Sequence, residues 1–457
     1  MKKNIIILSI LGLLLSTLFG CKQESNDEFL KDYATILYFI NSGEQDLTIY
    51  KTGFNTVHPI VVNKAGSDLS TKTTATVSLM TQAELEEYNQ ENLTNYRLLP
   101  EDCYTMFNQH ANVDFESNEL YKSVEVEFIL DKIEALGDNV ALKEYAFPLM
   151  LISTDSVNSK KSSVVYVPQV LVPTVAFGKT GYVRNEFIDG GSDKMNLELL
   201  LTLPVKNRWD FDCTIDISEE KLAEYNQKNN SNYAMLPASA YKTNLVNNKI
   251  DFKKDTDKNT YKAISVDVDR SELAYGNYIL PFYLAACSME SFVIDDEKDE
   301  CLFGFSYVPN ASKMRPISLT SSMLSSPHAQ SGDGGGVAAL VDGDTETYFH
   351  SSYSAPMPEN PYIQVNLDDE YVALSFSYVT RKQNDNGTPV AITVQTSIDG
   401  TNFYSVGTVG ELPGGKEESY SSSVFVSQPF KYVRIVASET KAGYFAMSEL
   451  SLNGYAE

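Results

Sequence analysis

The residues best suited to ligand chemistry lie between Ala339 and Ser352, in the stretch ALVDGDTETYFHSS. Two aspartates flank a glycine, a threonine follows, and a histidine comes directly after two aromatic residues. Oxygen atoms of this kind suit calcium, and a histidine beside aromatic rings can hydrogen-bond a bound ligand. A D-G-D turn between two strands needs no ligand at all. The stretch therefore permits a metal site, a ligand site or a simple turn.

The composition limits the partners of the chain. The formal net charge is −25, so the chain repels nucleic acid and anionic membrane surfaces. Hydrophobic residues make up 43% and charged residues 21%, which is typical of a globular protein rather than a disordered one. We therefore expect neutral partners or cations.

The N-terminus predicts export and a lipid anchor. Lys2 and Lys3 precede an apolar run from Ile5 to Leu15, which is typical of a signal peptide over residues 1–20. The letters LFGC end at Cys21 and resemble the lipobox of bacterial lipoproteins, in which this cysteine is acylated. The polar tether over 21–34 resembles signals for the outer face of the outer membrane. The expected location is therefore the outer membrane, facing the exterior and held by lipid only.

The remaining cysteines are Cys103, Cys213, Cys287 and Cys301. Cys287 and Cys301 bracket a predicted hairpin between the strands YILPFYLAA and LFGFSYV. An exported protein can form a disulfide between these two, and a pair of free thiols is the alternative. The four histidines are scattered, which argues against a zinc cluster.

An internal repeat organises the first two thirds of the chain. The segment AELEEYNQENLTNYRLLPEDCY returns as EKLAEYNQKNNSNYAMLPASAY, and Tyr88 and Tyr225 are one of several pairs separated by 137 residues. Alternating strands such as YKSVEVEF predict sheets, and TQAE from Thr81 predicts a capped helix. The repeated tyrosines either form a binding surface or pack the helix on the sheet, and the asparagines would then serve turns. We expect two copies of one domain, at 35–173 and 174–310.

This tandem pair resembles the domain of unknown function 1735, found in surface lipoproteins of glycan-scavenging Gram-negative anaerobes. The resemblance depends on the lipobox, the tandem arrangement and the L-x-x-Y-N-x-x-N-x-x-N-Y-x-x-L-P segment. It implies immunoglobulin-like sandwiches, each with a short helical insert, and a role at the cell surface. It transfers no catalytic residues.

After the predicted linker PNASKMRP, residues 317–457 contain strands such as YIQVNL, AITVQTS and KYVRIVAS, separated by polar loops. This pattern predicts a sandwich or jelly roll, so the whole chain is expected to be all-β. The stretches ALVDGDTETYFHSSYS, PYIQVNLDD, KYVRIVAS and AMSELSLNG resemble, in order, the discoidin (coagulation factor 5/8 type C) domain. Its sugar-binding branch is carbohydrate-binding module family 32. Phe349 stands where the family usually has a core tryptophan.

The resemblance gives roles to individual residues. It implies a structural calcium ion, and some members of the family bind none. The expected ligands are Asp342, Asp344, Thr347 and Glu449. It also implies a glycan pocket built from aromatic and hydrogen-bonding side chains. The expected glycan-binding residues are His350, Tyr353, Arg381, Asn384 (or Asn386), Tyr444 and Phe445.

These observations favour a cell-surface lipoprotein that captures oligosaccharide or glycoprotein glycan, beside an outer-membrane transporter and surface glycosidases. The enzyme alternative would need two placed carboxylates. Asp210, Asp212 and Asp216 alternate along a predicted strand, which is typical of a solvated face, and no room remains for a barrel of about 250 residues. We expect no catalysis. A protein-binding adhesin or assembly subunit remains the second possibility, because discoidin folds also bind proteins.

Overall fold

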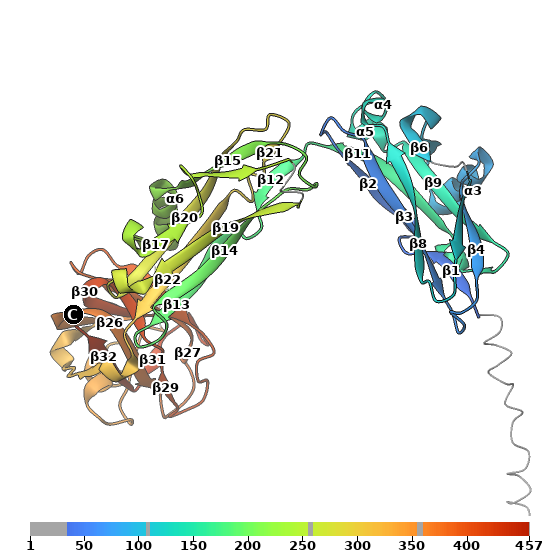
Figure 1. The fold of residues 1–457 in the computed structure, drawn as a ribbon. Coiled ribbons are helices and arrows are strands. Elements are labelled where there is room, and N and C mark those ends of the chain that lie inside the picture. The colour runs from blue at the N-terminus through green and yellow to red at the C-terminus, as the bar shows by residue number, and fades with distance from the viewer. Residues whose placement is uncertain (1–33, 107–109, 255–258, 354–359, 457) are drawn as a thin grey trace, which may run out of the picture. The chain divides into compact units, whose positions relative to one another are not determined.

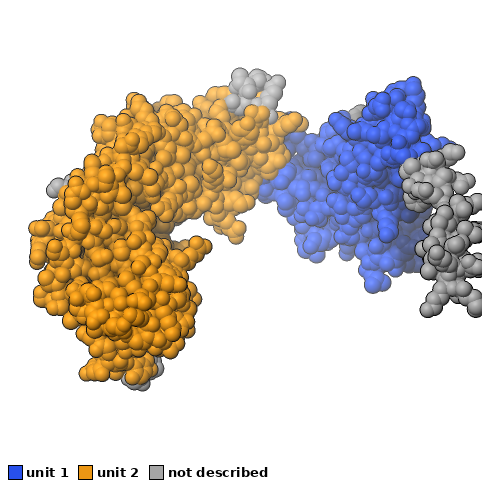
Figure 2. Space-filling model, turned by 90° about the horizontal axis from the view of Figure 1, so that it is seen from below, with its two compact units in different colours: residues 1–173 blue, residues 174–457 orange. Residues whose placement is uncertain are grey.

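The structure is a computed structural model that describes residues 34–106, 110–254, 259–353 and 360–456. The predicted signal peptide, most of the tether and the predicted lipidation site Cys21 lie outside the described residues. The described chain is built from β-sheets with a few short helices (Figure 1), as the all-β prediction required. It forms two compact units, residues 1–173 and 174–457 (Figure 2). Among the described residues, none of the helices is long and apolar enough to span a membrane.

The first unit contains repeat 1, a sandwich of two sheets with strand orders β10-β1-β3-β8-β6 and β2-β11-β9-β4-β7. Inward side chains of both sheets, such as Ile60 and Phe147, share one buried cluster. The strands are β1 (Ile36–Phe39), β2 (Gly43–Tyr50), β3 (Thr56–Ala65), β4 (Thr73–Leu79), β5 (Arg97–Leu98), β6 (Tyr104–Met106), β7 (His110–Phe115), β8 (Tyr121–Phe128), β9 (Tyr145–Ser153), β10 (Ser156–Val157) and β11 (Ser163–Leu171). The helices are α3 (Gln82–Asn92), α4 (Leu130–Glu134) and α5 (Asn139–Leu142), with 3-10 turns η1 (Glu101–Cys103) and η2 (Ser159–Lys161).

The second unit begins with repeat 2, whose sheets have the orders β17-β19-β14-β12-β21 and β13-β22-β20-β15-β18. Each order is that of repeat 1 with every strand replaced by its counterpart, so the repeated sequence folds into a repeated topology. The strands are β12 (Thr174–Phe177), β13 (Gly181–Ile188), β14 (Lys194–Thr202), β15 (Phe211–Ile217), β16 (Ala234–Met235), β17 (Tyr241–Thr243), β18 (Lys249–Phe252), β19 (Tyr261–Asp269), β20 (Gly276–Cys287), β21 (Val293–Ile294) and β22 (Glu300–Val308). The helix is α6 (Glu219–Asn229), with 3-10 turns η3 (Ala238–Ala240), η4 (Arg270–Glu272) and η5 (Ala311–Lys313).

The helical inserts form as their capping residues predict. The Thr81 hydroxyl accepts a hydrogen bond from the Glu84 N–H at 3.3 Å, and the Glu84 carboxylate accepts one from the Thr81 N–H at 2.7 Å. Two orphan donors of the first turn are thereby satisfied. In α6 the Tyr225 ring stacks on Tyr182 of β13, with ring centroids 5.2 Å apart. This contact supports the packing interpretation of the repeated tyrosines in repeat 2.

The repeated asparagines close the turns that follow the helices. In repeat 1 the Asn89 amide donates to the Tyr96 carbonyl at 2.9 Å and accepts from the Tyr96 N–H at 3.0 Å. Asn226 makes the same pair of bonds to Tyr233, each at 2.9 Å. One amide side chain therefore mimics a strand partner for the loop in both copies.

The C-terminal domain has an eight-stranded sheet system of order β23-β32-β26-β30-β27-β28, with β24 and β29 also paired to β26, and a separate two-stranded sheet, β25-β31. Alternating residues of the long strands β26 and β30, including Ile363 and Ile435, are fully buried. The strands are β23 (Arg315–Ile317), β24 (Leu324–Ser325), β25 (Phe349–His350), β26 (Tyr362–Val379), β27 (Pro389–Ser397), β28 (Tyr404–Val409), β29 (Ser419–Ser421), β30 (Phe425–Thr440), β31 (Ala446–Met447) and β32 (Glu449–Tyr455). Its 3-10 turns are η6 (Ser321–Met323) and η7 (Gly336–Val341).

Repeat 2 and the C-terminal domain are docked on one another. The buried Asn277 amide donates to the Val426 carbonyl at 2.7 Å, and Asn230 at the end of α6 donates to the Phe403 carbonyl at 3.1 Å. Lys313, inside the predicted linker, pairs with Asp189 of repeat 2 at 2.6 Å. The linker is therefore an ordered connection, because its polar groups are bonded to repeat 2.

Candidate functional site

Two loops of the C-terminal domain are held together by the short strands β25 and β31. His350 lies opposite Ala446 in this pairing. The buried Ser351 locks the pair, since its N–H donates to the Phe445 carbonyl and its hydroxyl accepts from the Phe445 N–H, both at 2.8 Å. Two segments almost a hundred residues apart in sequence are thereby fixed side by side, and this brings His350 next to Tyr444.

Three rings gather at this junction, and we call His350, Tyr353 and Tyr444 the aromatic cluster. The His350 and Tyr444 ring centroids are 4.5 Å apart, and Tyr353 lies 5.2 Å from His350 and 6.1 Å from Tyr444. Tyr353 is 58% exposed, Tyr444 is half-buried and His350 is buried. The cluster therefore offers aromatic surface to solvent with a histidine at its base.

His350 is held in a defined protonation and tautomer. Its Nδ1 lies 2.6 Å from the Ser351 carbonyl oxygen. Because a carbonyl only accepts, Nδ1 carries the proton, and the neutral ring presents the Nε2 lone pair as an acceptor. Burial lowers the pKa of His350, so the neutral form prevails at pH 7. The ring can accept a hydrogen bond from a ligand hydroxyl.

A chain of polar groups adjoins the cluster, and we call Asp333, Tyr348 and Arg381 the polar chain. The Tyr348 hydroxyl donates to the Asp333 carboxylate at 2.8 Å and accepts from Arg381 Nη2 at 2.8 Å. The Arg381 guanidinium also lies over the Tyr348 ring, 3.8 Å from its centroid. The hydrogen bond from Tyr348 lowers the pKa of Asp333, and the positive charge of the Arg381 guanidinium lowers it further. Asp333 is thus held in its ionised form, while Tyr348 keeps the hydroxyl proton that it donates to Asp333.

The structure brings together most of the predicted glycan-binding residues. His350, Tyr353 and Tyr444 touch one another, and Arg381 joins them through Tyr348, whose ring centroid is 6.3 Å from that of His350. Asn384 serves its own turn, because its side-chain Oδ1 accepts from the Asn386 N–H at 3.0 Å.

The prediction for Phe445 is wrong. Phe445 is fully buried and packs edge-on against Phe349, with ring centroids 5.9 Å apart. Of these two neighbours, Tyr444 therefore faces the cluster and Phe445 belongs to the core.

Sequence reasoning missed two members of the site, Asp333 and Tyr348. Tyr348 stood inside the quoted stretch, directly before Phe349, and its hydroxyl was the available signal. Asp333 lies in a glycine-rich loop whose close packing on Tyr348 depends on Gly334. Gly334 has φ of +66°, and a Cβ there would lie 2.3 Å from the Tyr348 carbonyl oxygen.

The D-G-D stretch forms a closed turn. Asp342 accepts from the Asp344 N–H at 2.9 Å and from the Thr347 hydroxyl at 2.8 Å. Asp344 turns its carboxylate to the Glu346 N–H at 3.0 Å. Among the described residues, no group of three or more His, Cys, Asp or Glu side chains is arranged to hold a metal ion.

Glu449, at the start of β32, nevertheless lies against this turn. Its Oε1 is buried and has no hydrogen-bond partner in the structure. Burial raises the pKa of Glu449, and the Asp342 carboxylate beside it raises that pKa further. The Glu449 carboxyl also hydrogen-bonds Asp342 and the backbone of Gly343 and Asp344, so two acid groups share this turn, and a cation bound there would relieve their repulsion.

The strand register excludes the predicted disulfide between Cys287 and Cys301. All four cysteines of the described residues are free thiols. In the pairing of β20 with β22, Cys301 lies opposite Phe282, which is five residues before Cys287. Five residues of strand span about 16 Å, whereas bonded cysteines have Cα atoms within about 7 Å.

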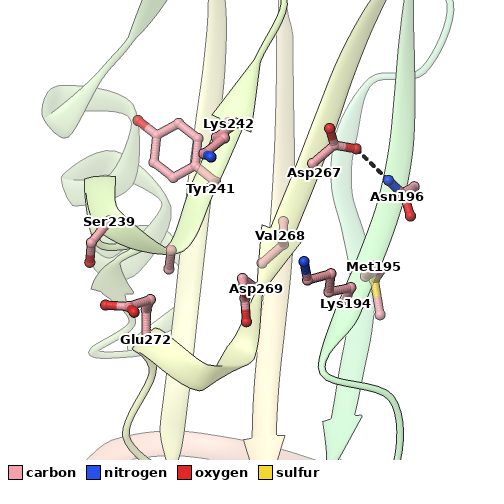
Figure 3. Close-up of a pocket in the computed structure, with 11 residues that line it drawn as sticks. Lys194, Met195, Asn196, Ser239, Tyr241, Lys242, Asp267, Val268, Asp269 and Glu272 are labelled. Carbon is pink, nitrogen blue, oxygen red and sulfur yellow. Dashed lines mark hydrogen bonds between the residues drawn. The ribbon is translucent and has the colours of Figure 1, made fainter.

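A hollow lies on repeat 2, between β14, β17 and β19 (Figure 3), with a volume of about 480 Å³. Its lining mixes charges of both signs, and Asp267 accepts a hydrogen bond from Asn196. In repeat 1 a cavity of about 500 Å³ includes Tyr104, the counterpart of Tyr241, but apolar side chains such as Leu79 and Met106 line it. The two hollows are formed mostly by different elements, β14, β17 and β19 in repeat 2 and the ends of β4, β5 and β6 in repeat 1.

Comparison with known families agrees with this architecture. A family model described as an N-terminal domain matches residues 31–158 and again 161–290, more than half of the chain, which therefore belongs to that family. Residues 320–450, which carry the aromatic cluster, match the F5/8 type C domain. The C-terminal domain is a discoidin domain. These matches confirm the resemblance and the tandem arrangement that the internal repeat predicted.

Solved structures similar to the chain include several β-sandwich domains. CpGH89CBM32-5 from Clostridium perfringens, solved with GalNAc-β-1,3-galactose, is 23% identical and covers 31% of this chain and 100% of its own, with a TM-score of 0.27. The family 32 carbohydrate-binding module of NanJ from C. perfringens, solved with galactose, is 15% identical. It covers 31% of this chain and 98% of its own, with a TM-score of 0.27. A two-domain protein of unknown function from Bacteroides fragilis is 12% identical. It covers 62% of this chain and 94% of its own, with a TM-score of 0.28. The assignment of the discoidin domain depends on the family match alone.

Proposed function

We propose that the discoidin domain binds carbohydrate at the aromatic cluster and the polar chain, without catalysing a reaction. The observation that carries the proposal is the contact of His350 with Tyr353 and Tyr444 at the junction of two loops. Sugars present C–H faces to aromatic rings and hydroxyls to directional donors and acceptors. The site combines both kinds of group within one rigid frame.

Each group has a definite task in this proposal. Tyr353 and Tyr444 supply ring surface for the apolar face of a sugar. The Nε2 of neutral His350 accepts from one hydroxyl. Arg381, already held by Tyr348, donates to a sugar oxygen with little loss of side-chain freedom, because its orientation is fixed in advance.

We also propose the cellular setting that the N-terminus predicts. Acylation of Cys21 would hold the protein on the outer membrane, and the discoidin domain would retain glycan near a transporter and surface glycosidases. A single sugar site binds in the micromolar to millimolar range, and clustering on a membrane raises the effective affinity without new contacts. Replacing Cys21→Ala should move the protein from the membrane fraction to the soluble fraction, and a variant that stays in the pellet would refute the anchor.

Calcium is proposed as a structural ion at the turn that follows η7. Asp342 and Glu449 would hold it together with oxygen atoms of the turn, such as those of Thr347. The orphaned Glu449 Oε1 supports this set. When bound, the ion would neutralise the two carboxylates and stiffen the turn, and it has no part in sugar chemistry.

The binding proposal is tested by calorimetric titration of the purified chain with galactose, N-acetylgalactosamine, N-acetylglucosamine and mannose-rich N-glycans. Tyr444→Ala and Arg381→Ala should each weaken binding of the responding sugar about fivefold or more. Arg434→Ala is the matched control, because Arg434 also lies over an aromatic ring, Phe403, at 3.6 Å, outside the site.

If the intact chain binds none of these glycans, the protein-binding adhesin becomes the better hypothesis. If it binds one and the site variants and Arg434→Ala all bind it equally well, the carbohydrate site lies elsewhere.

A further inference from the structure

Two cysteines of repeat 2 face each other across neighbouring strands. In the antiparallel pairing of β15 with β20, Cys213 lies directly opposite Cys287. The flanking pair is hydrogen-bonded, since the Ser288 N–H donates to the Asp212 carbonyl at 2.9 Å. Cys213 and Cys287 therefore occupy a non-hydrogen-bonded position, where opposed Cα atoms lie about 4.5 Å apart. That separation falls within the range of bonded cysteines.

The two side chains also point to the same side of the sheet. Cys213 is fully buried in the core of repeat 2, and Cys287 packs against the same cluster while remaining partly exposed. The bulge between Thr214 and Ile215 shifts the register of β15 on β20 by one residue, and this shift brings the two cysteines opposite each other. In repeat 1 the pair at the matching point of β4 and β9 is Ala75 opposite Ser153, so the fold does not require cysteine there.

The partly exposed cysteine is the more reactive of the two. The Cys213 thiol donates to Cys287 and, with the Met289 N–H, lowers the pKa of Cys287 to about 7. The same contact raises the pKa of Cys213. A thiolate at the surface with a thiol beneath it is the arrangement that thiol–disulfide exchange needs.

We propose that Cys213 and Cys287 form a disulfide in the oxidised protein. The oxidant is a disulfide-bearing carrier, either a small molecule or a protein. The Cys287 thiolate attacks one carrier sulfur, which forms a mixed disulfide and expels the other carrier sulfur as a thiolate. That thiolate takes the proton of Cys213, whose sulfur then attacks Cys287 Sγ and releases the second carrier sulfur. Two electrons pass to the carrier, and two protein thiols become one disulfide.

The test is to incubate the full chain with oxidised glutathione, unfold it, alkylate the remaining thiols and identify the peptides by mass spectrometry. The expected product is a linked peptide containing Cys213 and Cys287, with Cys103 and Cys301 alkylated. The oxidised chain should also melt several degrees above the reduced chain, because the bond restricts the unfolded state. That difference should vanish in Cys287→Ser and persist in the control Cys301→Ala.

Cys287→Ser is suited to this test because Cys287 is partly exposed, so the variant keeps the core of repeat 2. Recovery of Cys213 and Cys287 in fully alkylated form after oxidation would overturn the proposal. A linked peptide joining Cys287 to Cys301 would overturn it as well, together with the register of β20 and β22.

Discussion

Replacing Gly387→Ala should disable the aromatic cluster without removing any ligand-contacting group. Gly387 has φ of +77°, and a Cβ added there would lie 2.5 Å from Tyr444 Cε2 and 3.2 Å from the Ala446 Cβ. Carbon atoms cannot approach to 2.5 Å, so the Tyr444 ring must move. Ala446 is less free to move because its N–H donates to the Gly387 carbonyl at 2.8 Å.

The loss of stability in Gly387→Ala has two parts. A positive φ costs an alanine about 1–2 kcal/mol, and overpacking costs about 1–3 kcal/mol more. Gly443→Ala has only the first part, because Gly443 has φ of +74° and its Cβ would meet nothing within 4 Å, so the difference between the two variants isolates the overpacking cost. The melting temperature of Gly387→Ala should therefore lie at least about 2 °C below that of Gly443→Ala. Loss of the stacked ring should weaken sugar binding about fivefold, or about 1 kcal/mol.

Calorimetric titration with the responding sugar measures the loss of affinity, and thermal unfolding measures the decrease in Tm. Adding Gly387→Ala to Tyr444→Ala should cause little further loss of binding, because the ring that the new methyl group displaces is already gone. Equal affinities of Gly387→Ala and Gly443→Ala would refute the role of the Tyr444 ring position. A full additional loss in the double variant would show that Gly387 acts through another group.

Three further predictions concern protonation, metal and domain docking. Burial lowers the pKa of His350, so below about pH 6.5 the unfolded chain takes up a proton while the folded site stays neutral. The free energy of unfolding should therefore fall as the pH drops from about 6.5 to the lowered pKa of His350. The variant His350→Gln should remove this part of the pH dependence of Tm. If calcium binds at the turn, chelation should lower the Tm of the discoidin domain, and Asp342→Asn should abolish that response; a Tm unmoved by chelator, with no calcium in elemental analysis, would refute the site. Asn277→Ala leaves the Val426 carbonyl and the Ser306 hydroxyl without their partner, which costs about 1–3 kcal/mol of stability. Calorimetry should then show a lower Tm, or separate transitions for repeat 2 and the discoidin domain. An unchanged single transition would show that this hydrogen bond does not hold the two domains together.

Local patterns in the sequence were enough to predict the all-β class, the tandem repeat and the helical inserts. Side-chain alternation has a period of two in a strand, and a capping box involves residues only three apart, as in Thr81 and Glu84. The spacing of 137 residues between the repeats needs no knowledge of the fold. The resemblance to the discoidin family likewise followed from short stretches in the right order.

The tertiary structure decided which side chains meet. The polar chain joins Asp333, Tyr348 and Arg381, which come from separate loops, and no local pattern reports their contact. The bend before β31 leaves the Tyr444 ring half-buried in the cluster and places Phe445 in the core, and the residue types alone do not distinguish these two aromatic neighbours.

The cysteines show the same limit. Cys287 and Cys301 are near in sequence and share a hairpin, yet the register separates them, and the bulge between Thr214 and Ile215 brings Cys213 opposite Cys287 instead. Register follows from the packing of two whole sheets and from a single inserted residue, so it is a property of the assembled domain. Residue types alone determined that thiols, rings and carboxylates were present, and only the fold determined their partners.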